Sequence, residues 1–136
     1  MRHIIIATHY NLAQGLKSTV EFLTSLDNIK VICAYVDENF KIEKHIEEIF
    51  SEIDRKEDEV LIFTDILGGS VNQKFLPYIG EKTHLITGIN LPIVMSLSLK
   101  GGQLITSKDI EEAIEESKQQ IVYMNNFHCD EGDDDE

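Results

Sequence analysis

The chain has 136 residues, with 25 acidic and 12 basic side chains and a formal net charge of −13 at pH 7. Nucleic-acid phosphates require a basic face, so this balance argues against a nucleic-acid partner. No segment approaches the roughly 20 consecutive apolar residues of a membrane span, and the two cysteines form no metal-binding CxxC pattern. We therefore expect a cytoplasmic protein that does not insert into a membrane and holds no metal ion. Its length fits one domain, which we place at residues 1–125, before an acidic tail at 126–136 that we expect to be disordered.

Short apolar runs predict the strands, and apolar residues at helical spacing predict the helices between them. Strands are expected at residues 3–7, 29–36, 60–64 and 83–87, with a fifth, short strand at 121–124. Helices are expected at residues 12–26, 42–53, 71–78 and 92–99, and after a capping box formed by Thr106-Ser-Lys-Asp109. This alternation predicts an α/β fold: a doubly wound, three-layer protein with a mainly parallel central sheet. The usual strand order of such a sheet is 2-1-3-4, here with the C-terminal strand at an edge.

Two of the predicted strands end in polar residues that can carry chemistry. The first leads from Ile4-Ile5-Ile6-Ala7 into Thr8-His9, and the third leads into Thr64-Asp65. In the order 2-1-3-4, the carboxyl ends of the first and third strands flank the ligand crevice. We therefore expect His9 and Asp65 to meet in space at that crevice.

A neutral imidazole is a capable nucleophile toward a phosphoryl group, provided that its free lone pair points outward. A carboxylate that accepts the other ring N–H fixes both the tautomer and the ring angle. The sequence thus indicates His9 as a phosphoacceptor, through Nε2, and Asp65 as the group that orients it. Donors to the phosphoryl group are expected from hydroxyls and backbone N–H groups of the two exits: Thr8, Thr64, Gly68, Gly69 and Ser70. Neither exit loop contains Lys or Arg, so further positive charge would come from a partner.

Taken separately, these features have simpler interpretations. A single histidine is most often a surface or core residue, Gly68-Gly69-Ser70 alone would be a plain turn, and Asn90 fits a helix cap as well as the crevice. A receiver domain also uses an aspartate after its third strand, but it needs acidic residues after the first, where this chain has Thr8-His9. A flavin-binding module needs a loop dense in hydroxyls and aromatics at the same place, which this chain lacks.

Three motifs together resemble the enzyme IIA domain of the mannose class of the bacterial phosphoenolpyruvate-dependent sugar phosphotransferase system. They are Ile6-Ala7-Thr8-His9, Thr64-Asp65-Ile66-Leu67-Gly68-Gly69-Ser70 and Gly88-Ile89-Asn90-Leu91-Pro92, within a similarity that extends to about Met124. The resemblance implies that His9 accepts a phosphoryl group from the phosphocarrier HPr and passes it to a IIB domain. It implies that Asp65 orients His9, that the hydroxyls of Thr64 and Ser70 lie by the phosphoryl group, and that no metal or other cofactor takes part. It also implies a homodimer that exchanges its last strand, here Ile121 to Met124.

The chain departs from the family pattern at two positions. Tyr10 stands where members commonly have glycine after the histidine, and Val71 stands where they tend to have proline. Neither change removes a group that carries chemistry, although Tyr10 leaves the transfer rate and the choice of partner open. A regulatory relative, such as the phosphotransfer subunit of dihydroxyacetone kinase, stays an alternative to a role in sugar uptake. The transported sugar cannot be read from the sequence, because specificity belongs to the membrane component.

Overall fold

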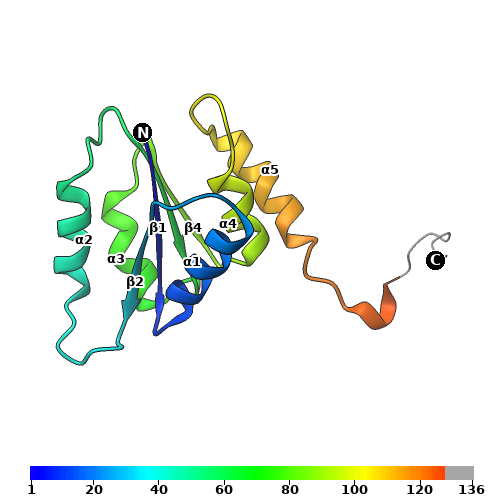
Figure 1. Ribbon diagram of the computed structural model, residues 1–136, viewed down its shortest axis with the longest axis horizontal. Coiled ribbons are helices and arrows are strands. Elements are labelled where there is room, and N and C mark those ends of the chain that lie inside the picture. Colours follow the sequence, from blue (N-terminus) through cyan, green and yellow to red (C-terminus); the bar gives the residue numbers. More distant parts are fainter. Residues whose placement is uncertain (128–136) are drawn as a thin grey trace.

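The structure is a computed structural model that describes residues 1–127, with strands and helices alternating as the sequence predicts (Figure 1). The expected acidic tail, apart from residues 126 and 127, lies outside the described residues. The strands are β1 (Arg2–His9), β2 (Ile29–Ala34), β3 (Glu59–Thr64) and β4 (Thr83–Thr87). The helices are α1 (Leu12–Leu23), α2 (Ile42–Ser51), α3 (Ser70–Phe75), α4 (Leu91–Ser98) and α5 (Ser107–Lys118), with short 3-10 helices η1 (Leu76–Tyr78) and η2 (Met124–Asn126).

The four strands form one parallel sheet in the order β2-β1-β3-β4, which confirms the predicted doubly wound arrangement. In β1, Ile4 pairs with Ile29 of β2 on one side and with Leu61 of β3 on the other. The pleat sends alternate residues of a strand to opposite faces. Ile4 therefore joins the core beneath α1, α4 and α5, whereas Ile5 joins the core beneath α2 and α3. Figure 1 shows these two groups of helices on opposite sides of the sheet. Burial on both faces explains why the strands are apolar almost throughout.

Two strand ends differ from the prediction, and both differences matter to the site. β1 continues past Ala7 to His9, because β2 still runs beside it and His9 pairs with Ala34. β2 stops at Ala34 and not at Val36, because Tyr35 has a φ of 71° and a left-handed residue cannot continue a strand. His9 is thus the last residue of β1, and Tyr35 is the first residue after β2.

The expected fifth strand is not formed by this single chain. Residues 121–123 have no regular secondary structure, and Met124–Asn126 form η2. The backbone hydrogen bonds here are local, such as that from Asn126 N–H to the carbonyl of Tyr123. After α5 the chain leads away from the sheet, as Figure 1 shows. A strand needs a neighbouring strand to pair with, and this segment pairs with no strand of the described part of the chain.

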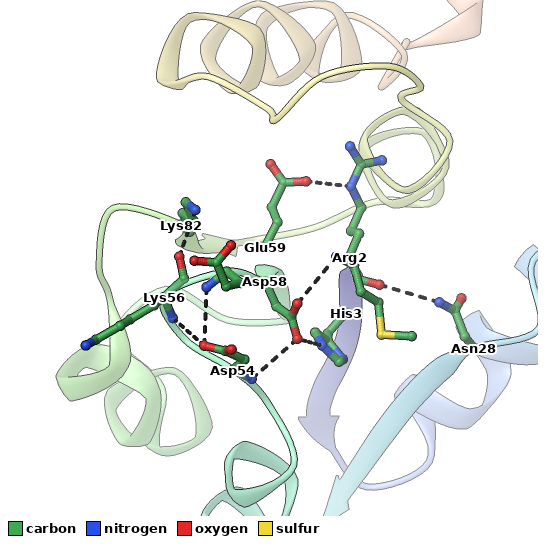
Figure 2. Close-up of polar contacts among 10 residues, drawn as sticks. Arg2, His3, Asn28, Asp54, Lys56, Asp58, Glu59 and Lys82 are labelled. Atoms are coloured by element: carbon green, nitrogen blue, oxygen red, sulfur yellow. Dashed lines mark hydrogen bonds and ion pairs between the residues drawn. The ribbon is translucent and has the colours of Figure 1, made fainter.

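An ion pair and a hydrogen bond hold the amino ends of β1 and β3 together (Figure 2). Arg2 Nε donates to Oε1 of the buried Glu59 at 2.7 Å, and His3 Nε2 lies 2.8 Å from Asp58 Oδ2. The bond to His3 is the main reason why the pKa of Asp58 falls below its ordinary value. Because Arg2 and His9 are the first and last residues of β1, this cluster lies at the end of the sheet opposite to His9. It links the strands and leaves the carboxyl edge free.

Candidate functional site

His9 and Asp65 meet at the carboxyl edge of the sheet, as expected. His9 ends β1, Asp65 follows β3 directly, and the two strands are neighbours. His9 Nδ1 lies 3.1 Å from Asp65 Oδ2 and 3.2 Å from Oδ1. The backbone N–H of His9 also donates to Oδ2, at 2.9 Å. One carboxylate therefore holds both the backbone and the ring of His9.

This contact decides which ring nitrogen is free. A carboxylate accepts hydrogen bonds, so Nδ1 carries the proton that points to Asp65. In the neutral ring, Nε2 then carries the lone pair. The side chain of Asp65 is only 9% exposed, whereas that of His9 is 34% exposed. The oriented imidazole is therefore open to a molecule that approaches from solvent.

Gly69 packs closely against the ring of His9. A Cβ atom at this residue would lie 3.2 Å from His9 Cε1 and 3.2 Å from the carbonyl oxygen of Ile66. The turn thus needs glycine here for a close approach. Its neighbour Gly68 has a φ of 73°, a conformation that glycine adopts without steric cost. The N–H of Gly69 donates to the carbonyl of Ile66 at 3.1 Å and is thereby used within the turn.

Ser70 brings a hydroxyl to the free nitrogen of His9. Its Oγ lies 3.5 Å from Nε2, and the hydroxyl of Tyr35 lies 2.6 Å from that same Oγ. The ring centroids of Tyr35 and His9 are 5.6 Å apart, with the ring planes tilted by 31°. Ser70 is the first residue of α3, so its N–H has no acceptor within that helix. Ser70 was expected in this place, but Tyr35 was not.

The two threonines of the site are buried and already hydrogen bonded. Thr8 Oγ1 accepts from the N–H of Ala13 at 2.7 Å, which ties the loop after β1 to α1. Thr64 Oγ1 donates to Oδ1 of the buried Asn72 at 3.0 Å. Because a hydroxyl has one proton, Thr64 can donate to a phosphoryl group, as the sequence predicts, only by giving up Asn72. In the structure described, both threonines serve to fix the loops that carry His9 and Asp65.

The third motif forms a helix cap. Asn90 Oδ1 accepts from the N–H of Ile93 at 3.0 Å, at the start of α4, and Asn90 Nδ2 donates to the carbonyl of Ser117 in α5. Of the two interpretations that the sequence leaves open for Asn90, the helix cap is the one that the structure bears out. The motif therefore joins α4 to α5.

In the part of the chain that the structure describes, neither Lys nor Arg is hydrogen bonded or ion paired to His9, Asp65 or Ser70. On α3, Lys74 is paired with Glu43 of α2, and this pairing raises the pKa of Lys74 and lowers that of Glu43. Within residues 1–127, no three His, Cys, Asp or Glu side chains are grouped so as to hold a metal ion. None of the helices formed by these residues has the length and apolar character needed to cross a bilayer.

Fold and site together define a doubly wound α/β protein with a carboxylate-oriented histidine at its carboxyl edge. A sequence model of the family EIIA-man, described as the PTS (phosphotransferase system) fructose IIA component, matches residues 3–116. The chain belongs to this family of phosphotransferase system IIA components, which confirms the resemblance seen in its motifs.

Solved structures agree with this assignment. A protein of Klebsiella pneumoniae subsp. pneumoniae MGH 78578, assigned as a phosphoenolpyruvate-dependent sugar phosphotransferase system permease, is 34% identical, with a TM-score of 0.83 and 92% of each chain covered. The PTS IIA protein associated with the fucose utilization operon of Streptococcus pneumoniae is 21% identical, with a TM-score of 0.75, over 91% of this chain and 93% of that one. The mannose/sorbose specific IIA subunit of Enterococcus faecalis is 9% identical, with a TM-score of 0.73, over 94% and 98%. The last two show the fold alone, and the comparison with curated proteins found no match.

Sequence reasoning missed two residues, Tyr35 and Asn72. Tyr35 was counted within the second strand, since aromatic and β-branched residues favour strands. The signal that could have found it is the strand order, because the second strand is also a neighbour of the first, and its exit lies at the same edge. Asn72 carried no comparable signal, because its bond to Thr64 depends on how α3 packs.

Proposed function

We propose that this chain is a cytoplasmic IIA phosphocarrier of a sugar phosphotransferase system. In this proposal His9 accepts a phosphoryl group on Nε2 from phospho-HPr and passes it to a IIB domain during sugar uptake. The observation that carries the proposal is the contact of His9 Nδ1 with Asp65, because it leaves Nε2 as the free, outward nitrogen. Membership of the IIA family supports the choice of HPr and IIB as partners.

The transfer needs no proton to move at His9. The lone pair of Nε2 attacks phosphorus, a P–N bond forms, and the bond between phosphorus and the donor atom of HPr breaks, with its electron pair going to HPr. Nδ1 keeps its proton, so the phosphorylated ring becomes a cation. Asp65, whose carboxylate accepts that N–H, stabilises this charge. Onward transfer to IIB reverses these roles and restores the neutral ring.

In this proposal, the partner protein would supply positive charge at the phosphoryl group. The phosphoryl group carries negative charge, and the described residues bring no Lys or Arg to His9. A cation from HPr or IIB would balance this charge in the transition state. Exposed apolar side chains follow the carboxyl ends of β1, β2 and β3. We call them the apolar rim, and they form a suitable surface for docking: Tyr10, Leu12, Tyr35, Val36, Ile66 and Leu67.

A labelling assay tests the proposal. The chain is incubated with enzyme I, HPr and phosphoenolpyruvate, and the acid-labile phosphate is then mapped. We expect His9→Ala to abolish labelling, and Asp65→Ala to slow it by about 10- to 100-fold, the range known for loss of a carboxylate that orients a metal-binding histidine. The control is His45→Ala, which removes an exposed histidine of α2. Unchanged labelling of His9→Ala would exclude His9 as the phosphoacceptor.

We also propose that the protein is a homodimer in which the segment Ile121 to Met124 pairs as a strand with a second copy. Two observations support it. The apolar side chains of Ile121, Tyr123 and Met124 are exposed in the single chain. Among residues 1–127, β4 pairs with β3 alone, which leaves its outer edge open to a further strand.

A further inference from the structure

Tyr35 has a backbone conformation that its local sequence does not favour. Its φ is 71°, in the left-handed region that non-glycine residues rarely adopt, least of all bulky ones. Such a conformation persists only where the surrounding structure imposes it. Burial is not the cause, because Tyr35 is 56% exposed. The hydrogen bond and ring contact that the structure shows for its side chain are those with Ser70 and His9.

The hydroxyl bond is the specific contact. At 2.6 Å, the distance between Tyr35 Oη and Ser70 Oγ is that of an ordinary hydrogen bond, whereas Ser70 Oγ lies 3.5 Å from His9 Nε2. A phenol is more acidic than an aliphatic alcohol, so Tyr35 is the better donor of the pair. When Tyr35 donates, the single proton of Ser70 is left to point toward His9.

We propose that Tyr35 is a positioning residue for phosphoryl transfer at His9, acting through Ser70; this inference rests on the proposed function. In the unphosphorylated protein, Tyr35 keeps the Ser70 hydroxyl near Nε2 without a strong bond to it, so the lone pair stays available for attack. As the P–N bond forms, Nε2 no longer accepts a hydrogen bond, and the proton of Ser70 turns to a phosphoryl oxygen. The bond from Tyr35 polarises Ser70 and strengthens that donation.

Removal of one hydroxyl tests the proposal. Tyr35→Phe keeps the ring, and with it the contact to His9 and the apolar rim. We expect kcat for transfer from phospho-HPr to fall about 3- to 10-fold, the effect of one lost hydrogen bond, with KM and the melting temperature unchanged. The matched control is Tyr78→Phe, because Tyr78 stacks on Phe50 at 4.4 Å, away from the site.

A double-mutant cycle tests the path through Ser70. In a Ser70→Ala background, Tyr35→Phe should cause no further loss, because the bond it removes is already absent. A purely structural contribution of the Tyr35 hydroxyl would instead lower the rate equally in both backgrounds, and that outcome would overturn the proposal. The proposal would also be overturned if the wild-type chain is labelled at His9 and the Tyr35→Phe variant transfers at the same rate. If the wild-type chain takes no label at His9, the proposed function itself fails, and this inference fails with it.

Discussion

At the scale of single residues, the site depends on a few short contacts with His9. Asp65 accepts from both its backbone N–H and its ring, so the end of β1 and the angle of the imidazole are fixed together. Gly69 also lies close to the ring, because a Cβ atom at this residue would be only 3.2 Å from His9 Cε1. The ring is therefore held in place before any partner arrives, which lowers the entropic cost of reaching a reactive geometry.

Gly69→Ala should therefore slow phosphoryl transfer. The new methyl group would lie 3.2 Å from both His9 Cε1 and the carbonyl oxygen of Ile66, so the ring and the turn must shift by a few tenths of an ångström. We expect a fall of about 3- to 10-fold in the labelling rate, since small displacements of a reacting group are costly. Initial rates with phospho-HPr measure the effect.

Gly15→Ala is the matched control for that substitution. A Cβ atom at Gly15 has nothing within 4 Å, and the residue lies inside α1. We expect an unchanged labelling rate and a gain of about 0.5–1 kcal/mol in the free energy of unfolding, because alanine favours helix over glycine. Equal labelling rates for wild type and Gly69→Ala would contradict the role given to that close contact.

The sequence predicts the residues that directly follow apolar runs better than those that depend on packing. His9 and Asp65 could be paired in advance, because each ends a buried strand and the order 2-1-3-4 makes those strands neighbours. The end of β2 at Ala34 could not be predicted, since it depends on the left-handed φ of Tyr35. The orientation of the Thr64 hydroxyl also could not be predicted. It is set by a hydrogen bond to Asn72 of α3, which depends on how two elements pack together.

At the scale of elements, the local sequence was sufficient to predict the start of α5, because the capping residues belong to the helix itself. Thr106 accepts from the N–H of Asp109, and Asp109 accepts from the N–H of Thr106, both at 3.0 Å, so the predicted capping box of α5 is confirmed. The segment 121–124 shows the opposite case. Its composition favours a strand, but a strand also requires an edge to pair with, and the sequence of one chain cannot supply that information.

The capping box predicts a pH-dependent stability. The N–H of Thr106 holds the pKa of Asp109 below its ordinary value of 3.8. The stabilisation by the ionised carboxylate is therefore complete above about pH 3.8 and is lost as the pH falls through the lower pKa of the folded state. Asp109→Asn should lower the free energy of unfolding at pH 7, and its difference from wild type should shrink below pH 3.8. Urea unfolding at pH 7 and pH 3 measures this.

Glu112→Gln controls for the change in net charge, since it makes the same change on an exposed position of α5. We expect it to leave the free energy of unfolding nearly unchanged at pH 7, as is usual for surface substitutions. A difference between wild type and Asp109→Asn that is the same at both pH values would show that the carboxylate charge contributes nothing to the cap.

At the scale of the whole molecule, the amino edge of the sheet is cross-linked by side chains, whereas the carboxyl edge carries the exposed histidine. The amino edge is tied by the bonds of Arg2 to Glu59 and of His3 to Asp58. The carboxyl edge leaves His9 open, with the apolar rim around it and no cation bonded to it among the described residues. A net charge of −13 favours the approach of basic surfaces, and in the proposed function such a surface would bring the cation that the site needs.

The proposed dimer yields the last prediction, which uses proline to interrupt strand pairing. Proline has no backbone N–H, and the N–H groups of adjacent strand residues point to opposite sides, so Val122→Pro or Tyr123→Pro must remove a hydrogen bond to the second copy. In the single chain Tyr123 has a φ of −81°, close to that of proline, so the fold of one chain should tolerate this change. We expect a dimeric mass for the wild-type chain in sedimentation, and a shift toward monomer for at least one variant.

Phe22→Asp, at an exposed apolar residue of α1, is the control and should leave the dimer intact. A monomeric wild type would exclude the dimer, whereas two dimeric proline variants would exclude pairing through this segment.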